Sequence, residues 1–117
     1  MTARELLHVD EDRGLELRRA RLGAGEAERT AALFRALGDP TRLQLARCLQ
    51  GEDELCVCDL SWIAERSQNL VSHHMKLLKA AGIVGARREG KMTMYRLTDA
   101  GRSLLAQVGG DRQDSSA

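Results

Sequence analysis

Apolar residues recur every three or four positions through the middle of the 117-residue chain, which is the spacing of a helix face. Runs of this kind predict helices over residues 26–37, 40–50, 60–65, 68–81 and 98–108. The pattern changes between the last two helices. There the segments 83–87 and 92–97 have the composition of strands, and the intervening Arg88-Glu-Gly-Lys91 predicts a hairpin turn.

Local signals delimit these helices. Asp39 is a good N-cap, and Pro40 suits the first helical position because its missing N–H would be unpaired there. Ser67 predicts the start of the helix over 68–81, and Gly82 its end. Two short helices joined by a tight turn and followed by a hairpin are the parts of a winged helix-turn-helix. The predicted fold class is therefore α+β, mostly helical; an α+β domain of another kind is the alternative.

The ends of the chain differ from its middle. Residues 1–25 are polar with scattered leucines and predict an N-terminal arm, in which 15–22 have the pattern of a short amphipathic helix ended by two glycines. Residues 26–108 form the predicted winged helix-turn-helix domain. The polar stretch 109–117 predicts a disordered tail.

Two absences in the sequence indicate a cytoplasmic protein. No apolar run reaches about 18 residues, so no membrane span is expected. Residues 1–10 lack the basic-then-apolar pattern of a signal peptide. In the cytoplasm the three cysteines are expected to be reduced, and a close pair is more often a metal or redox site than a structural disulfide.

Charge is unevenly distributed along a chain whose net charge is +1. Residues 1–16 hold five acidic residues against two arginines, and residues 68–96 hold six Lys or Arg against one acid. A basic patch on a near-neutral chain is the electrostatic pattern of a DNA-binding face. On charge alone, a solvated basic surface without a nucleic-acid partner is an equal alternative.

Cys56 and Cys58 stand two residues apart just before the helix predicted over 60–65. Thiolates are soft ligands that suit Cd(II), Pb(II), Zn(II) or As(III). In a regular helix, side chains two residues apart point about 200° apart, because each residue turns roughly 100°; in an extended segment they face the same side. Metal capture is therefore expected to favour an unwound start to the helix-turn-helix, which would connect the ion to DNA affinity.

Several motifs together indicate a family. They are Gly38-Asp-Pro-Thr-Arg42, Glu54-Leu-Cys-Val-Cys-Asp-Leu60, Ser67-Gln-Asn-Leu-Val-Ser-His-His74, Arg87-Arg-Glu-Gly-Lys91 and Tyr95-Arg-Leu97. Over about residues 26–100 the chain resembles the ArsR/SmtB family of metal-sensing repressors, and within it the cadmium, lead and zinc sensors of the CadC type. The resemblance implies a homodimer that holds palindromic operator DNA when metal-free and releases it when metal binds.

The resemblance also implies where the remaining metal ligands lie. In CadC-like proteins further thiolates come from an N-terminal arm across the dimer, but this arm has no cysteine. His8 aligns near an arm cysteine and is the predicted third ligand, with Asp10 or Glu11 as oxygen donors. As(III) prefers three thiolates, and Cys48 is expected to be a small buried residue of the preceding helix. A divalent metal is therefore favoured, and an arsenite- or antimonite-responsive repressor is the alternative.

A second metal site of the family uses Asp and His ligands on the last helix. Asp99 matches its first position, but Gly101 stands where the histidine is expected, and no histidine follows His74. That site is predicted to be absent.

The helix over 68–81 is expected to enter the major groove by its first turns. Gln and Asn pair bidentately with adenine, and Ser or His reaches bases or phosphates. Lys and Arg on this helix and on the hairpin are expected to meet the DNA backbone or minor groove. The resemblance implies DNA contacts from Gln68, Asn69, Ser72 and His73, and the basic residues predicted to contact DNA are Lys76, Arg87, Arg88 and Lys91.

Three other functions compete with the metal-sensor prediction. Oxidation of Cys56 and Cys58 would make a thiol redox switch, although a disulfide across one intervening residue is strained. An enzyme is not expected, because no catalytic partner for a cysteine nucleophile is recognisable. A winged helix that binds only protein is disfavoured by the basic segment.

Overall fold

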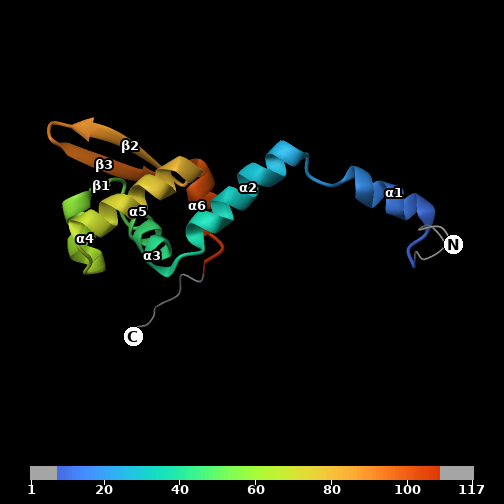
Figure 1. Ribbon diagram of the computed structural model, residues 1–117, viewed down its shortest axis with the longest axis horizontal. Coiled ribbons are helices and arrows are strands. Elements are labelled where there is room, and N and C mark those ends of the chain that lie inside the picture. The colour runs from blue at the N-terminus through green and yellow to red at the C-terminus, as the bar shows by residue number, and fades with distance from the viewer. Residues whose placement is uncertain (1–7, 109–117) are drawn as a thin grey trace.

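In the computed structural model, which describes residues 8–108, a helical body carries a small sheet at one end and a separate helix at the other (Figure 1). The elements are α1 (Glu11–Arg19), α2 (Ala24–Leu37), α3 (Pro40–Cys48), β1 (Leu55–Cys56), α4 (Val57–Ala64), α5 (Gln68–Ala81), β2 (Val84–Glu89), β3 (Met92–Leu97) and α6 (Asp99–Leu105). The predicted α+β, mostly helical winged helix-turn-helix is confirmed. The tail predicted over 109–117 lies outside the described residues.

The core is built around α5, which contacts α2, α3, α4 and β2. Its apolar face is fully buried, because Val71, Met75 and Leu78 recur at helical spacing on the side that meets these elements. The other large side chains that are fully buried with them come from α3, α4, α6 and the segments between helices: Leu45, Leu49, Leu60, Ile83 and Leu105. Among residues 8–108, no helix is long and apolar enough to cross a membrane.

The sheet has the strand order β1-β3-β2, and both pairings are antiparallel. The β2–β3 hairpin is the wing, and Gly90 turns it in a left-handed conformation (φ 62°) that favours glycine. The two-residue strand β1 was not predicted from the sequence. It pairs Leu55 with Tyr95 and Cys56 with Met94, so the wing holds the segment that leads into α4.

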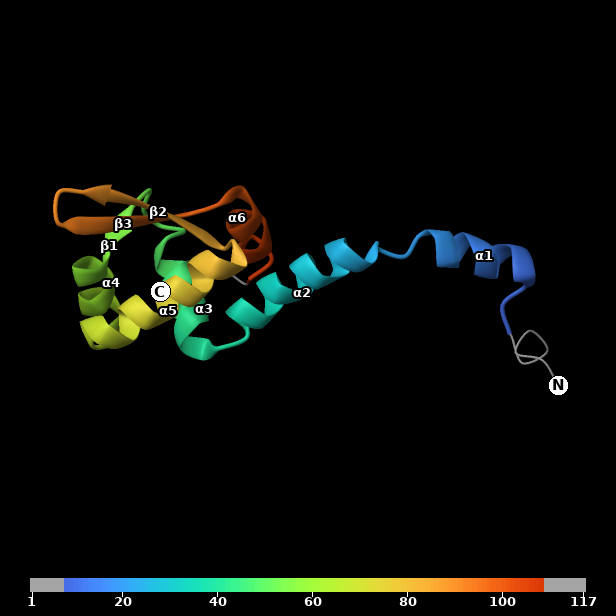
Figure 2. The same cartoon turned by 45° about the horizontal axis from the view of Figure 1, so that its top comes forward.

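The N-terminal helix α1 differs from the prediction in its position. It begins at Glu11 rather than residue 15, because the Asp10 side chain accepts a hydrogen bond from the Arg13 N–H and caps it. None of its residues is buried. In both views α1 lies beyond the end of α2, at the opposite end of the molecule from α4 and the wing (Figures 1 and 2).

Two other helices begin earlier than their apolar patterns predict. α2 starts at Ala24 rather than residue 26, with Gly23 as its N-cap. α4 starts at Val57 rather than residue 60, because Cys56 takes the extended N-cap conformation and Asp59 accepts its backbone N–H. Both ends of α5 are as predicted.

Candidate DNA-binding face and cysteine pair

A tight turn joins α4 to α5. Glu65 ends α4 in a left-handed conformation (φ 57°), and the Arg66 N–H donates to the Ser61 carbonyl over 3.2 Å. The Ser61 hydroxyl also donates to the Arg66 carbonyl. Ser67 then caps α5 by accepting from the Leu70 N–H over 3.1 Å. The turn therefore fixes where the first residues of α5 emerge.

The predicted base-contacting residues lie at the start of α5. Gln68, Asn69 and His73 are exposed, and Ser72 is half-buried. Lys76 follows one turn after Ser72 and is also exposed. The opposite side of the helix is buried in the core, so these side chains face solvent in the arrangement that a groove-reading helix needs.

His74 lies at a junction between helices and not on the solvent face of α5. Its Nδ1 lies 3.3 Å from Arg42 Nη1, and because a guanidinium has only donors, Nδ1 accepts. Arg42 Nε also donates to the Ala36 carbonyl over 2.7 Å. The Arg42 N–H bonds to Asp39 and holds the pKa of that carboxyl below its ordinary value. Arg42 thus joins the end of α2 and the start of α3 to α5, and the sequence did not single it out.

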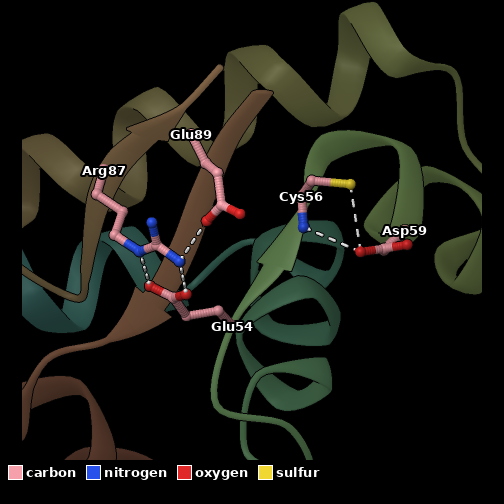
Figure 3. A network of polar contacts seen from close by, with 5 residues as sticks. All are labelled: Glu54, Cys56, Asp59, Arg87 and Glu89. Carbon is pink, nitrogen blue, oxygen red and sulfur yellow. Dashed lines mark hydrogen bonds and ion pairs between the residues drawn. The ribbon is translucent and has the colours of Figure 1, made fainter. Parts of the chain in front are cut away.

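The three cations predicted on the wing have different surroundings. Arg87 is held by carboxylates: Nε and Nη2 donate to the two oxygens of Glu54 over 2.7 and 2.6 Å, and Nη2 lies 2.7 Å from Glu89 Oε1 (Figure 3). These hydrogen bonds lower the pKa of Glu54 and raise that of Arg87. Lys91 is exposed at the hairpin turn, and Arg88 is exposed with a 3.4 Å contact to the Gly90 carbonyl.

Cys56 ends β1 and begins α4. Its side chain is 7% exposed. Both its backbone N–H and its thiol donate to Asp59 Oδ2, over 3.1 and 3.2 Å (Figure 3). This resembles a capping box, in which a side chain three residues into the helix reaches back to the N-cap N–H.

Cys58 has a different environment, because it is the second residue of α4 and is exposed. Cys56 is extended (φ −89°, ψ 173°), whereas Cys58 is already helical. The pair therefore lies across the boundary between strand and helix. The segment is thus neither wholly helical, with the two side chains about 200° apart, nor wholly extended, with both on the same side.

A hollow of about 310 Å³ joins the cysteines to the predicted DNA-binding face. Both cysteines line it. The rest of its lining comes from the first turns of α5 and from the wing: Val57, Gln68, Asn69, Ser72, Lys91, Met92 and Thr93. On the other side of Cys58 a second hollow, of about 500 Å³, is bordered by Asp59 and Trp62. Trp62 is 83% exposed.

Two predicted or alternative ligands lie apart from the cysteine pair within one chain. His8 is exposed and precedes α1. Helix α1 lies at the opposite end of the molecule from α4 (Figure 1). Cys48 lines another hollow, with Pro40 and Arg66 among its neighbours, and burial raises the pKa of its thiol. Within residues 8–108, no three Cys, His, Asp or Glu side chains are already grouped to hold a metal ion.

The position of the second family site is closed by packing. Gly101 is buried in α6, and a Cβ there would collide with the Ile83 carbonyl oxygen. A histidine at this position would require the backbone to move, so Asp99 has no neighbouring ligand from residue 101.

Sequence reasoning also missed Glu54 and Asp59 as site residues. A signal for Asp59 was present, because Cys-x-x-Asp before an apolar run has the spacing of a capping box. Glu54 had none, since its partner Arg87 lies 33 residues away.

Comparisons with known proteins agree with this architecture. The family model described as bacterial regulatory protein, arsR family, matches residues 39–85. A cadmium resistance transcriptional regulatory protein CadC homolog of Staphylococcus aureus is 49% identical over 69 residues, which are 59% of this chain and 57% of that relative. The cadmium resistance regulator CadC of Listeria innocua is 33% identical over 91 residues, 78% of this chain and 76% of that relative.

A solved structure is similar as well. It is a homodimeric winged helix-turn-helix DNA-binding domain from Mycobacterium bovis, described as a possible ArsR-family transcriptional regulator. The TM-score is 0.65 at 27% identity, and the match covers 74% of this chain and 83% of that one.

Proposed function

Because the chain belongs to the ArsR/SmtB family of helix-turn-helix transcriptional regulators, we propose that it is a metal-responsive repressor. The metal-free homodimer binds palindromic operator DNA in the cytoplasm. A soft divalent ion, Cd(II), Pb(II) or Zn(II), binds at Cys56 and Cys58 and releases the DNA. As a family member the chain is a transcriptional regulator and not an enzyme.

The observation that supports this proposal most directly is the hollow of about 310 Å³ shared by Cys56, Cys58, Gln68 and Lys91. An ion drawn into it would act within contact distance of the first turn of α5 and the tip of the wing. Because β1 carries Cys56 and pairs with β3, a change of backbone at Cys56 reaches the wing directly. Ligand binding at this place therefore has a physical route to DNA affinity.

The donor set suits a soft divalent ion. Two thiols are available, which become soft thiolate ligands when a metal ion displaces their protons. Cys56 has an extended backbone and Cys58 a helical one. In the proposal His8 of the partner subunit supplies a further ligand, because α1, which His8 precedes in the same chain, lies at the opposite end of the molecule from α4. A bound ion would supply positive charge and a cross-link between these groups. As(III) would need a third thiolate, and Cys48 lines a separate hollow.

Metal titration of DNA binding tests the proposal. The reduced protein is mixed with labelled promoter DNA, and fluorescence anisotropy follows binding as Cd(II), Pb(II), Zn(II) or As(III) is added. Divalent metal is expected to release DNA from the parent chain but not from Cys56→Ser/Cys58→Ser. If oxidant releases the DNA and no metal does, the pair is a redox switch. If neither changes binding, the pair is not a sensor.

The proposed DNA binding predicts different salt dependences for variants of two basic residues of the wing. Lys91 is exposed, whereas Arg87 is held by Glu54 and Glu89. We expect Lys91→Gln to reduce the slope of log affinity against log salt by about 1, as the loss of one phosphate contact does. The matched variant Arg87→Gln is expected to leave the slope nearly unchanged. Equal slopes for both variants would mean that Arg87 leaves its carboxylates and contacts phosphate.

Three of the other predicted contacts are tested by comparing binding to the operator with binding to unrelated DNA. Gln68→Ala and Asn69→Ala are expected to weaken binding to the operator more than to unrelated DNA, because base contacts specify and phosphate contacts position. Lys76→Gln is expected to weaken both equally. A uniform loss in the Gln68 and Asn69 variants would mean that these side chains do not contact base edges.

A further inference from the structure

Three sulfur-bearing side chains from two separate segments border one hollow. Cys56 and Cys58 lie at the start of α4, and Met92 is the first residue of β3, in the wing. All three line the hollow of about 310 Å³ that also reaches the first turns of α5. The thioether of methionine is a soft donor, as a thiolate is, so the wing offers this hollow a further ligand of the same kind as the cysteine pair.

The pairing of the strands explains why Met92 lies near the cysteines. β1 and β3 are antiparallel, and Cys56 stands opposite Met94. Because side chains alternate between the two faces of a sheet, Met92 lies on the same face as Met94 and Cys56. Continued past the end of β1, the same register would place Cys58 opposite Met92. The chain instead turns into α4 at Val57, and Cys58 still borders the hollow with Met92.

The side chain of Met92 is not enclosed by the core. It is 48% exposed, whereas Tyr95 and Leu97 further along β3 are core residues. Its partner in β2 is Glu89, whose carboxylate is held by Arg87 over 2.7 Å. Methionine is unbranched and has three rotatable side-chain bonds, so the exposed thioether can reorient toward the cysteines without disturbing the packing of the sheet.

The two hollows beside Cys58 offer different donors. The hollow of about 500 Å³ is bordered by the carboxylates of Glu52, Glu54 and Asp59. The hollow of about 310 Å³ has neither a carboxylate nor an imidazole among the described residues that line it, and Lys91 adds a positive charge there. Thiolate and thioether donors favour Cu(I), whereas carboxylates suit harder ions. The neighbouring ammonium group also opposes a divalent charge more than a monovalent one.

We propose that Met92 is a thioether ligand from the wing, and that Cys56, Cys58 and Met92 form a three-sulfur site for Cu(I). This inference rests on the proposed function, because it uses the same cysteine pair, and it adds a monovalent effector to the divalent ions. On binding, the two thiols release their protons to water, the thioether stays neutral, and the oxidation state of copper does not change. The bound ion links the start of α4 to the residue after Lys91, which is proposed to contact DNA.

Met92→Leu tests this inference, because leucine is similar in size and lacks sulfur. The reduced protein is kept anaerobic, and its Cu(I) affinity is measured by competition with bicinchoninate. We expect a loss of about 10-fold or more, since even a group one shell further from a metal contributes about 10- to 100-fold. X-ray absorption of the copper-loaded protein is expected to show three sulfur neighbours in the parent chain and two in the variant. Zn(II) affinity is expected to stay the same.

Met94→Leu is the matched control. Met94 lies two residues further along the same strand, on the same face of the sheet, but it does not line the hollow. This variant is expected to bind Cu(I) like the parent chain. Circular dichroism of both variants establishes that the fold is intact.

The outcomes separate the two proposals. If Cys56→Ser/Cys58→Ser loses the metal while Met92→Leu keeps its Cu(I) affinity and its sulfur count, Met92 is not a ligand and the sensor proposal stands. If the double cysteine variant keeps its affinity for every metal, the sensor proposal itself is overturned. If Met92→Leu and Met94→Leu lose Cu(I) affinity equally, the effect comes from packing of the wing and the ligand role is rejected.

Discussion

The two helices of the helix-turn-helix are held in different ways. α5 buries Val71, Met75 and Leu78 completely, begins at a serine cap and ends at Gly82. α4 fully buries one residue, Leu60. Its first turn is held by the hydrogen bond between the Cys56 thiol and the Asp59 carboxylate. Packing holds the helix that is proposed to read DNA, whereas polar contacts hold the start of the helix before it. A ligand can replace a polar contact more readily than it can replace a core, and this difference is consistent with the proposal that the start of α4 responds to a metal ion.

The largest effect is expected where the core holds α5. Leu78→Ala removes a fully buried side chain, and cavity formation is expected to lower the free energy of unfolding by about 2–5 kcal/mol. Urea denaturation followed by circular dichroism measures it. Leu77→Ala is the control, because Leu77 on the same helix is 41% exposed. A similar loss in both variants would mean that packing does not distinguish the two sides of α5.

A smaller effect is expected from the two caps. Ser67→Ala and Asp59→Ala each remove an acceptor from a helix start, and each is expected to lower the free energy of unfolding by about 1 kcal/mol. Hydrogen exchange sharpens the contrast. Asp59→Ala is expected to speed exchange in the first turn of α4, whereas Ser67→Ala is expected to leave most of α5 protected because the core still holds it. Faster exchange throughout α5 after Ser67→Ala would contradict this contrast.

The smallest effect is expected from the ion pair between Glu54 and Arg87, which connects the segment before α4 to the wing. The Arg87 hydrogen bond lowers the pKa of Glu54 below its ordinary value. A carboxyl with a lowered folded-state pKa adds stability above its unfolded-state pKa of about 4.3, and this contribution disappears as pH falls through the folded-state pKa. Glu54→Gln is therefore expected to lower the urea midpoint slightly near neutral pH and not in strong acid. A difference that persists in acid would show that charge is not its source.

The same two helices show what could be predicted from the sequence. Both ends of α5 were predicted because Ser67 and Gly82 are local signals next to a clear apolar pattern. The predicted start of α4 is three residues late, although Val57 stands at helical spacing from Leu60, because the helix begins where the extended backbone of Cys56 ends. Its position depends on β1, whose two residues pair with a strand almost 40 positions further along the chain. A strand of two residues leaves no periodic pattern in a sequence.

The candidate site likewise contains residues that the sequence predicts and contacts that only the fold reveals. Cys56 and Cys58 are recognisable from residue type and spacing, and the predicted DNA contacts at the start of α5 follow from the family resemblance. Contacts between segments that are distant in the sequence could not be predicted in this way. The Glu54 carboxylate that holds Arg87 from 33 residues away, and the Arg42 guanidinium that bonds to His74 32 residues away, follow from tertiary structure. Arg87 was predicted to be like its neighbour Arg88, and only the fold distinguishes their surroundings.

Trp62 gives the protein a built-in optical reporter. It is the only tryptophan in the chain, it is 83% exposed, and it lies one helical turn beyond Cys58 beside the same hollow. Indole emission therefore comes from a single position, next to the place where the ion is proposed to bind. A heavy cation nearby would quench that light, and a segment of a second copy laid over the ring would move it toward the blue. Trp62 fluorescence can therefore follow the proposed metal binding without an added label.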